Sequence, residues 1–547
     1  ETCTTYSSTD SSQRKIIKGQ TTSTWNERGV FFLTSLGFTT GLQSICLFPV
    51  LCDLNGGTVF VLCTMLLYVL LGVPIVLMET GLGQLSRMSP TVLFPKLCPL
   101  LSVASSAKYF TTEILGTLSE SQVQGHLVLG LAITWTAVAV CLGSGIRHTG
   151  KLCYLTTPVI FLVSGIVLVR GLFLWNAAVS QFVAPQWNKM ADLSVWFISA
   201  CYVFHSLNLG MGGLMTISSH NKQTTNIVRD SVLVCLLHFL WGVSMWLAYV
   251  CLTAEYRENN AVAGPWILFV VLARGLAALP HGIVFSMIMY IMVFFVGIGT
   301  LLGTILTISS TLLHYVPVLR NRRGFVTTGA CIVLFLLGIP LASQAGLHLH
   351  LLISYNNIKW TLVLYSLCTC FCVMYCYGHR RFITQMCFIS NIKLQEITFT
   401  HLTVLYCTVI PAFLLLLLMS SFHAGMTLPD GMASHPQQLQ RVSWALTSLP
   451  VLLLPVCAAF NFIKLLNQKQ TVIQSFKSLL RPDDAWLEYM TSRFQCPTRC
   501  EKTTMTSPML VTATKDYSLN SNDGNNNLDE YVVNNALHKS YNEHSMF

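Results

Sequence analysis

The stretch from Trp25 to Gly57, WNERGVFFLTSLGFTTGLQSICLFPVLCDLNGG, decides the fold of this chain. It is apolar over most of its length, yet Gly37, Gly41 and Pro49 lie inside it. Glycine relaxes a helix, and proline removes a backbone donor from it. The pattern therefore predicts a helix that is long enough to cross a membrane but is interrupted near its middle.

A second stretch has the same character. Val195 to Met215, VWFISACYVFHSLNLGMGGLM, carries Asn208 and several glycines in a comparable position. Two interrupted spans about five helices apart are typical of inverted-repeat transporters, because unwound backbone inside a membrane is tolerated where it lines a cavity. The alternative is close packing of helices through small residues. The spacing alone leaves both interpretations open.

The composition places the chain in a membrane. Hydrophobic residues make up 53% of it and charged residues 10%, and its mean hydropathy is positive. Runs of about 20 apolar residues cross the roughly 30 Å of hydrocarbon in a bilayer, where the backbone satisfies its own hydrogen bonds in helices. We therefore expect an all-α polytopic membrane protein with about 11 spans. The expected spans lie near residues 30–51, 58–82, 124–144, 152–175, 193–217, 228–254, 282–314, 324–343, 358–378, 399–420 and 440–466.

The positive charge has a simple interpretation in such a protein. The net charge is +10, and basic residues gather in alternate loops, which lie on the cytoplasmic side by the positive-inside rule. We therefore expect no nucleic-acid partner, and we expect a multi-pass protein of the plasma membrane or of an intracellular vesicle membrane. The basic clusters are Arg147 with Lys151, Lys222 with Arg229, Arg320 with Arg322 and Arg323, and Arg380 with Arg381.

Nothing in the sequence indicates catalysis or metal–thiolate chemistry. Most of the 20 cysteines lie in apolar runs, where cysteine packs as a small hydrophobic residue. There is no nucleophile–base–acid set and no phosphate-binding loop, so we expect no enzyme activity.

Several ordered motifs resemble the sodium- and chloride-dependent neurotransmitter symporters. The resemblance begins with the tryptophan and the FTTGLQSICLFPVLCDLNGG segment of the first stretch, and it continues in GVPIVLMETGLGQ, GIRHTGK, LVRG and SSHNKQTTN. GIGTLLGT (Gly297 to Thr304) and SSAKYFTTEILGTLSES (Ser105 to Ser121) are most similar to the orphan and neutral-amino-acid branch. One such motif would be weak support, but the ordered set covers most of residues 25–466.

The resemblance implies two inverted five-helix repeats with discontinuous first and sixth helices, plus two extra helices. It also implies coupled movement of sodium and a small zwitterionic substrate. On this basis residues 1–24 are a cytoplasmic N-terminal segment, 25–466 the transmembrane symporter-like domain and 467–547 a cytoplasmic, largely disordered tail. No oligomeric state is predicted.

The resemblance assigns one sodium site to residues that suit sodium. This second sodium site uses the backbone carbonyls of Gly37, Thr40 and Val296 with the hydroxyl of Thr300. The aligned Gly299 lacks a side-chain oxygen that many members have, as the amino-acid branch does. We expect this site to bind sodium.

The first sodium site is degraded. The resemblance assigns it to Thr39, Ser44, Ser206 and His238. The short Ser44 side chain and the His238 nitrogen stand where the family has amide oxygens, and hard cations prefer oxygen ligands. We expect this site to bind sodium poorly.

The residues aligned with the chloride site are Thr64, Tyr202, Ser206 and Gly242. This set has lost most of the family's ligand side chains, so we do not expect chloride dependence. The expected substrate contacts are Thr39, Gly41, Leu42, Gln43, Ser206, Asn208 and Met211. Gln43 stands where the family has a small residue, and its amide either replaces a lost polar group or blocks the pocket; blocking is favoured.

The third span of the family has no counterpart. KLCPLLS runs directly into SSAKYF, and Lys108 and Glu113 argue against a span at 97–118, because a charge at the bilayer centre costs at least about 2.5 kcal/mol. Its loss would break the inside–outside alternation of every later helix. The charged gate pairs are also absent: their aligned positions are Leu47 with Ile353 or Ser354, and Thr22 with His314.

Together these features predict a sodium-coupled symporter of a small neutral amino acid or a related neurotransmitter-like substrate. The alternative is a transport-incompetent isoform or paralogue that acts as a membrane partner or scaffold. The resemblance also assigns Glu79 a structural role as the partner of backbone in the sixth helix.

Overall fold

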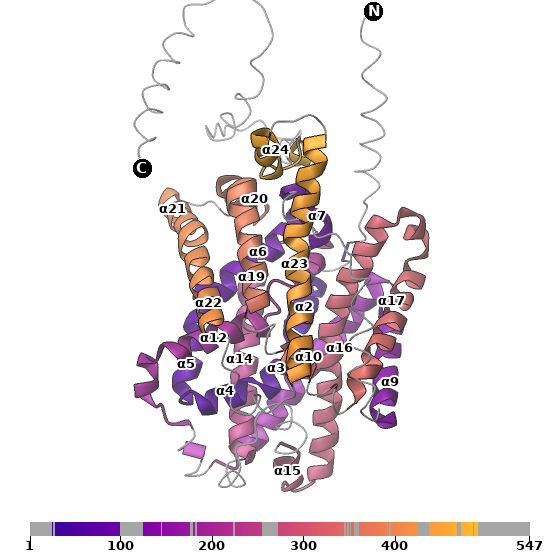
Figure 1. The fold of residues 1–547 in the computed structure, drawn as a ribbon. Coiled ribbons are helices and arrows are strands. Elements are labelled where there is room, and N and C mark those ends of the chain that lie inside the picture. Colours follow the sequence, from indigo (N-terminus) through magenta and orange to yellow (C-terminus); the bar gives the residue numbers. More distant parts are fainter. Residues whose placement is uncertain are drawn as a thin grey trace, which may run out of the picture. The chain divides into compact units, whose positions relative to one another are not determined.

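All the extended secondary-structure elements among the described residues of the computed structural model are helices (Figure 1). The residues outside the description are 1–23, 26–27, 99–123, 144, 176–178, 181–182, 223–224, 254–271, 344–345, 347–348, 351, 355–359, 391, 393–394, 425–436, 468–471, 485, 489 and 491–547. The α-helices are α2 (Arg28–Thr39), α3 (Leu42–Cys46), α4 (Phe48–Leu54), α5 (Thr58–Leu67), α6 (Val73–Ser86), α7 (Pro90–Leu97), α9 (Gly125–Gly143), α10 (Ile146–Leu172), α12 (Leu193–Ser206), α13 (Gly213–Ser219), α14 (Ile227–Thr253), α15 (Leu272–Ala277), α16 (Gly282–Tyr315), α17 (Arg323–Gly338), α19 (Leu362–Phe371), α20 (His379–Ser390), α21 (Glu396–Val404), α22 (Ile410–Ala424), α23 (Gln437–Asn467) and α24 (Val472–Leu479). Short 3-10 helices are η3 (Trp187–Ala191), η6 (Pro317–Arg322) and η7 (Ile339–Ala342).

Three pairs of these helices are single spans joined by a π-helical turn. The turns are η1 (Tyr68–Gly72) between α5 and α6, η9 (Cys372–Gly378) between α19 and α20, and η10 (Leu405–Val409) between α21 and α22. A π turn changes the hydrogen-bond spacing without ending the helix, so each pair crosses as one rod.

The prediction of an all-α polytopic membrane protein is confirmed. Among the described residues, eight helices are long and apolar enough to cross a membrane, and the bent first stretch makes up to nine. Two of the roughly 11 expected spans fall outside this count. The span expected at 193–217 is divided between α12 and α13, and the one expected at 440–466 corresponds to α23.

Contacts at the ends of α16, α17 and α9 show at which end of the bundle each of these helices begins. α16 ends beside α7, because the Tyr315 hydroxyl donates to the Thr91 carbonyl at 3.1 Å. η6 then leads directly into α17, so α17 begins at the α7 end. α9 runs antiparallel to α17, since the Gln124 N–H donates to the Ala342 carbonyl at 3.1 Å, just beyond the end of α17.

α9 therefore begins at the end of the bundle opposite to α7. The expectation that the missing third span breaks the alternation of later helices is wrong for this structure. The described chain leaves one end of the bundle at Cys98 and resumes at the other end at Gln124. The segment SSAKYF and the expected non-spanning stretch 97–118 lie almost wholly outside the described residues.

The basic loops share one end of the bundle, as predicted. Arg147 follows α9, whose last residue Gly143 lies against Gly324 at the start of α17. Lys222 accepts a hydrogen bond from the Gln84 side chain near the end of α6. The cluster at the start of α20 is also near α6, where a Cβ at Gly81 would meet the Phe382 and Met386 side chains.

The first part of the predicted tail contacts this end of the bundle. The Asp483 N–H donates to the Lys96 carbonyl of α7 at 3.0 Å, and Trp486 packs on Tyr377 with ring centroids 5.2 Å apart. Burial lowers the pKa of the Lys96 ammonium, and nearby Asp483 offsets part of that shift. Residues 491–547 and the predicted N-terminal segment up to residue 23 lie outside the described residues.

Candidate functional site

The first span is broken where the glycines predict it. α2 ends at Thr39 and α3 begins at Leu42, and the two halves of the span, Gly29–Thr39 and Leu42–Leu54, meet at 47°. Pro49 lies in the first turn of α4, where its missing N–H would have no intrahelical partner in any case. The bend therefore comes from the unwound residues around Gly41 and not from the proline.

The second break separates α12 from α13. Asn208, Gly210 and Gly212 all have positive φ, at 53°, 77° and 74°, and glycine reaches this region without steric cost. The Gly210 N–H donates to Oε1 of Glu79 at 2.7 Å. The predicted pairing of Glu79 with backbone of the sixth helix is confirmed.

The two breaks are joined directly. The Asn208 side chain, 2% exposed, donates from Nδ2 to the Phe38 carbonyl at 3.0 Å. The Phe38 ring fills the space between α13 and α16, because a Cβ at Gly213 or Gly303 would lie 2.2 Å or 2.1 Å from it. Both glycines are therefore needed for these helices to close around the first break.

Residues of the expected second sodium site lie on both sides of the contact between the first break and α16. A Cβ at Gly299 of α16 would lie 2.6 Å from the Gly37 carbonyl oxygen, so α16 approaches the end of α2 closely. Thr300 follows on the same helix, and its hydroxyl donates to the Val296 carbonyl at 3.4 Å. Thr40 lies in the break itself. Carbonyl and hydroxyl oxygens are the ligands that a hard cation prefers, so this set fits sodium. The close approach also explains why residue 299 has no side chain.

Gln43 covers the first break. Its Oε1 lies 2.1 Å from the position of a Cβ on Gly41, and Thr300 Oγ1 lies 3.6 Å from the same position. This oxygen is buried and has no hydrogen-bond partner among the described residues. The side chain thus occupies the space above Gly41, while Leu42 and Met211 remain 40% and 46% exposed.

The degraded first sodium site forms a hydrogen-bonded cluster, which we call the His238 cluster: Ser44, Tyr68, Tyr202, Ser206 and His238. Ser44 Oγ lies 3.2 Å from the Tyr202 hydroxyl and 3.3 Å from His238 Nε2. The Tyr68 hydroxyl lies 2.8 Å from His238 Nδ1 and 2.8 Å from Ser206 Oγ. Thr39, the remaining expected ligand, contacts His238 through its backbone, while its hydroxyl donates to the Leu36 carbonyl at 3.0 Å.

Sequence comparison with the family misses Tyr68, because the family motif aligns Thr64 instead. The available signal is helical spacing: Tyr68 follows Thr64 by one turn, and residues four apart share a helix face. A tyrosine in the middle of an apolar span also needs a partner for its hydroxyl when it is buried.

The residues aligned with the chloride site lie beside this cluster. Tyr202 and Ser206 are members of it, and a Cβ at Gly242 would lie 3.5 Å from the Tyr202 hydroxyl. The Thr64 hydroxyl is buried and finds no partner among the described residues. The two hydroxyls of the set that belong to the cluster are thus already hydrogen-bonded within it.

The positions aligned with the gates carry no opposite charges. Leu47, Ile353 and Ser354 are half-buried, and His314 packs edge-on against Tyr315 with ring centroids 5.5 Å apart. Thr22 lies outside the described residues.

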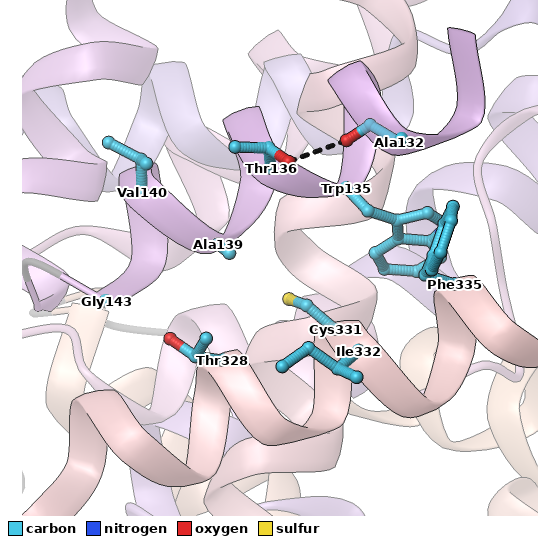
Figure 2. A pocket seen from close by; sticks show the side chains of 10 residues that line it. All are labelled: Ala132, Trp135, Thr136, Ala139, Val140, Gly143, Thr328, Cys331, Ile332 and Phe335. Carbon is cyan, nitrogen blue, oxygen red and sulfur yellow. Dashed lines mark hydrogen bonds between the residues drawn. The ribbon is translucent and has the colours of Figure 1, made fainter. Parts of the chain in front are cut away.

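A separate cavity of about 550 Å³ lies between α9 and α17, away from both breaks (Figure 2). Figure 2 shows Trp135, Phe335 and Cys331 on its walls, and the Thr136 hydroxyl donating to the Ala132 carbonyl of its own helix at 2.7 Å. None of the expected site residues lines this apolar cavity.

Comparison with known proteins assigns the chain to a family. The sequence profile of the sodium:neurotransmitter symporter family matches residues 22–118 and 102–465. The chain belongs to this family.

Several members of the sodium:neurotransmitter symporter family are similar to it at low identity. The sodium- and chloride-dependent glycine transporter 1 of Xenopus laevis is 26% identical over 457 residues, which cover 65% of this chain and 72% of the relative. The human sodium- and chloride-dependent neutral and basic amino acid transporter B(0+) is 27% identical over 377 residues, covering 67% of this chain and 58% of the relative. The mouse B(0+) transporter is 23% identical over 576 residues, covering 85% and 89%.

Membership supports the expectations of a multi-pass transporter and of sodium dependence, and the family is not an enzyme family. The names of these relatives include chloride as well as sodium. They give no support to the expectation that chloride is dispensable.

Proposed function

We propose that this chain is a sodium-coupled symporter that carries a small neutral amino acid. The observation that supports it most is the pair of facing helix breaks joined by the 3.0 Å bond from Asn208 to the Phe38 carbonyl, in a chain of a symporter family. The relatives whose names specify glycine or neutral and basic amino acids point to the same class of substrate.

In this proposal, sodium is held at the first break. The carbonyls of Gly37, Thr40 and Val296 and the hydroxyl of Thr300 are its ligands, and binding there joins the end of α2 to α16. The bound positive ion stabilises the unwound backbone beside it. The closeness of Gly37 to α16, seen in the 2.6 Å separation at Gly299, supports this assignment.

The substrate contacts are proposed at both breaks. Main-chain groups freed by the unwinding are available to the carboxylate and ammonium of a zwitterion, as in other broken-helix transporters. Asn208 acts in this proposal by holding the second break against the first. The proposed contact residues are Thr39, Gly41, Leu42, Gln43, Ser206, Asn208 and Met211.

A second candidate is a membrane protein that keeps the fold without transport. Gln43 favours it, because its side chain occupies the space above Gly41. Such a protein would act as a membrane partner or scaffold.

Uptake into proteoliposomes separates the two. The purified chain should accumulate radiolabelled glycine or another small neutral amino acid only when an inward sodium gradient is present, and parallel vesicles without chloride test the second ion. No gradient-dependent uptake of any small neutral amino acid would contradict the symporter proposal. Gln43→Gly is the diagnostic variant: uptake that appears only in this variant would identify the native chain as a blocked symporter.

A further inference from the structure

The first sodium site does not fit a sodium ion in this chain. We propose that the His238 cluster takes the structural place of that ion and joins the helices by a network of hydrogen bonds. This inference goes beyond the proposed function, because it concerns what holds the core of the bundle together and does not require transport.

The cluster ties together four elements. Ser44 comes from α3, Tyr68 from η1, Tyr202 and Ser206 from α12, and His238 from α14. It therefore connects the half-helix after the first break with the helix before the second break, and both with the π turn of the second span. An ion bound between broken helices would make connections of this kind.

The hydrogen-bonding capacity of His238 is fully used. Nε2 faces Ser44 Oγ at 3.3 Å and Nδ1 faces the Tyr68 hydroxyl at 2.8 Å, so a neutral ring donates from one nitrogen and accepts at the other. The chain of contacts continues from Ser44 to Tyr202 at 3.2 Å and from Tyr68 to Ser206 at 2.8 Å. A cation would have to compete for lone pairs that already accept hydrogen bonds.

The chemistry of the cluster also opposes a buried cation. Its side chains are hydroxyls and one imidazole, with neither a carboxylate nor a carboxamide, and the Thr39 backbone beside it already hydrogen-bonds His238. All five side chains are at most 4% exposed. A buried charge without an opposite charge is costly, whereas a satisfied neutral network is not.

Aromatic rings fill the space around the cluster. The Tyr68 ring stacks on the His238 ring with centroids 5.9 Å apart, and Tyr202 stacks on Phe48 at 4.8 Å. The Trp241 and His238 rings, on the same helix, have centroids 6.4 Å apart, and the Trp241 indole N–H donates to Ser164 Oγ at 3.0 Å. The imidazole is thus held by packing as well as by hydrogen bonds.

Tyr68→Phe tests the proposal, because it removes the hydroxyl that contacts both His238 and Ser206. The full chain is purified in detergent, and its thermal unfolding is followed in sodium chloride and in choline chloride. Tyr406→Phe is the matched control: it removes another buried tyrosine hydroxyl, which donates to the Pro74 carbonyl at 2.9 Å and belongs to no part of the cluster.

We expect Tyr68→Phe to lower the unfolding temperature equally in the two salts. An ion site would behave differently, because a bound ligand adds stability only where that ligand is present. A loss confined to sodium buffer, beyond any sodium dependence of Tyr406→Phe, would overturn the proposal.

Equilibrium binding of radioactive sodium gives a second measurement, and Ser44→Ala serves if Tyr68→Phe does not fold. We expect the number of sodium ions bound per chain to be the same in the native protein and in either cluster variant. A lower number in the variant would overturn the proposal. Failure of the proposed symport would appear instead as absent sodium-dependent uptake. A fall in bound sodium in Thr300→Val reports on the second sodium site, so these outcomes remain distinguishable from a change at the cluster.

Discussion

The bond between Asn208 and the Phe38 carbonyl provides the sharpest test of how the two breaks are held together. Asn208 is almost fully buried, has φ of 53° and donates at 3.0 Å across the two breaks. Three substitutions separate its contributions. Asn208→Gly removes the amide but accepts the positive φ, Asn208→Ala removes the amide and strains the backbone, and Asn208→Asp keeps the shape but loses the donor.

The expected magnitudes follow from these differences. Leaving the Phe38 carbonyl buried without its donor costs about 1 to 3 kcal/mol of unfolding free energy, which is the expected loss for Asn208→Gly. Asn208→Ala should lose roughly 1 kcal/mol more, because alanine pays the steric cost of the left-handed region that asparagine and glycine largely avoid. Asn208→Asp should be at least as damaging as Asn208→Gly, since it places an acidic oxygen against a carbonyl oxygen.

Thermal unfolding of the purified chain measures this order directly. Asn221→Ala is a useful control, because Asn221 is an equally buried asparagine whose side chain bonds Gln84 at 3.0 Å away from the breaks. The reasoning would be refuted if Asn208→Gly were as stable as the native protein, since the bond would then contribute nothing. It would also fail if alanine and glycine gave equal losses, because the backbone argument predicts a difference.

Three further predictions concern single contacts. Glu79→Ala strips the Gly210 N–H of its acceptor and should cost about 1 to 3 kcal/mol, whereas Glu79→Gln keeps an oxygen there and should cost less; thermal unfolding compares the pair, and equal losses would contradict the assignment. Gly299→Ala places a methyl 2.6 Å from the Gly37 oxygen and should weaken saturable sodium binding, and unchanged binding would argue against the second site. Lys96→Met should not lower the unfolding temperature, because burial destabilises the ammonium more than Asp483 stabilises it, as the lowered pKa of Lys96 indicates. A clear drop in unfolding temperature would show that the contact with Asp483 outweighs the cost of burial.

The fold could be predicted from the sequence wherever the cause is local. Gly41 and the run from Asn208 to Gly213 mark both breaks, because conformational freedom of the backbone is a property of single residues. Pro49 is a partial exception, since the same residue interrupts a helix in its middle and is tolerated in its first turn, and only the position of the α4 start decides between the two.

The site could be predicted less well, because it depends on contacts between helices. His238 and Ser44 are visible as departures from the family pattern, but their partner Tyr68 comes from a different span, and no sequence spacing relates the three. The two interpretations of Gln43 also required the side-chain position, which places its oxygen above Gly41.

α7 and the start of α9 lie at opposite ends of the bundle, and this placement decides the orientation of the later helices. Removing one span from a multi-pass chain should invert the orientation of every later helix. Here α9 and the helices after it keep the orientation in which the basic loops share one end of the bundle. Their orientation follows from where the chain resumes, because Gln124 lies at the end of the bundle opposite to Cys98. The absence of one span's sequence can thus leave the later helices in their original orientation.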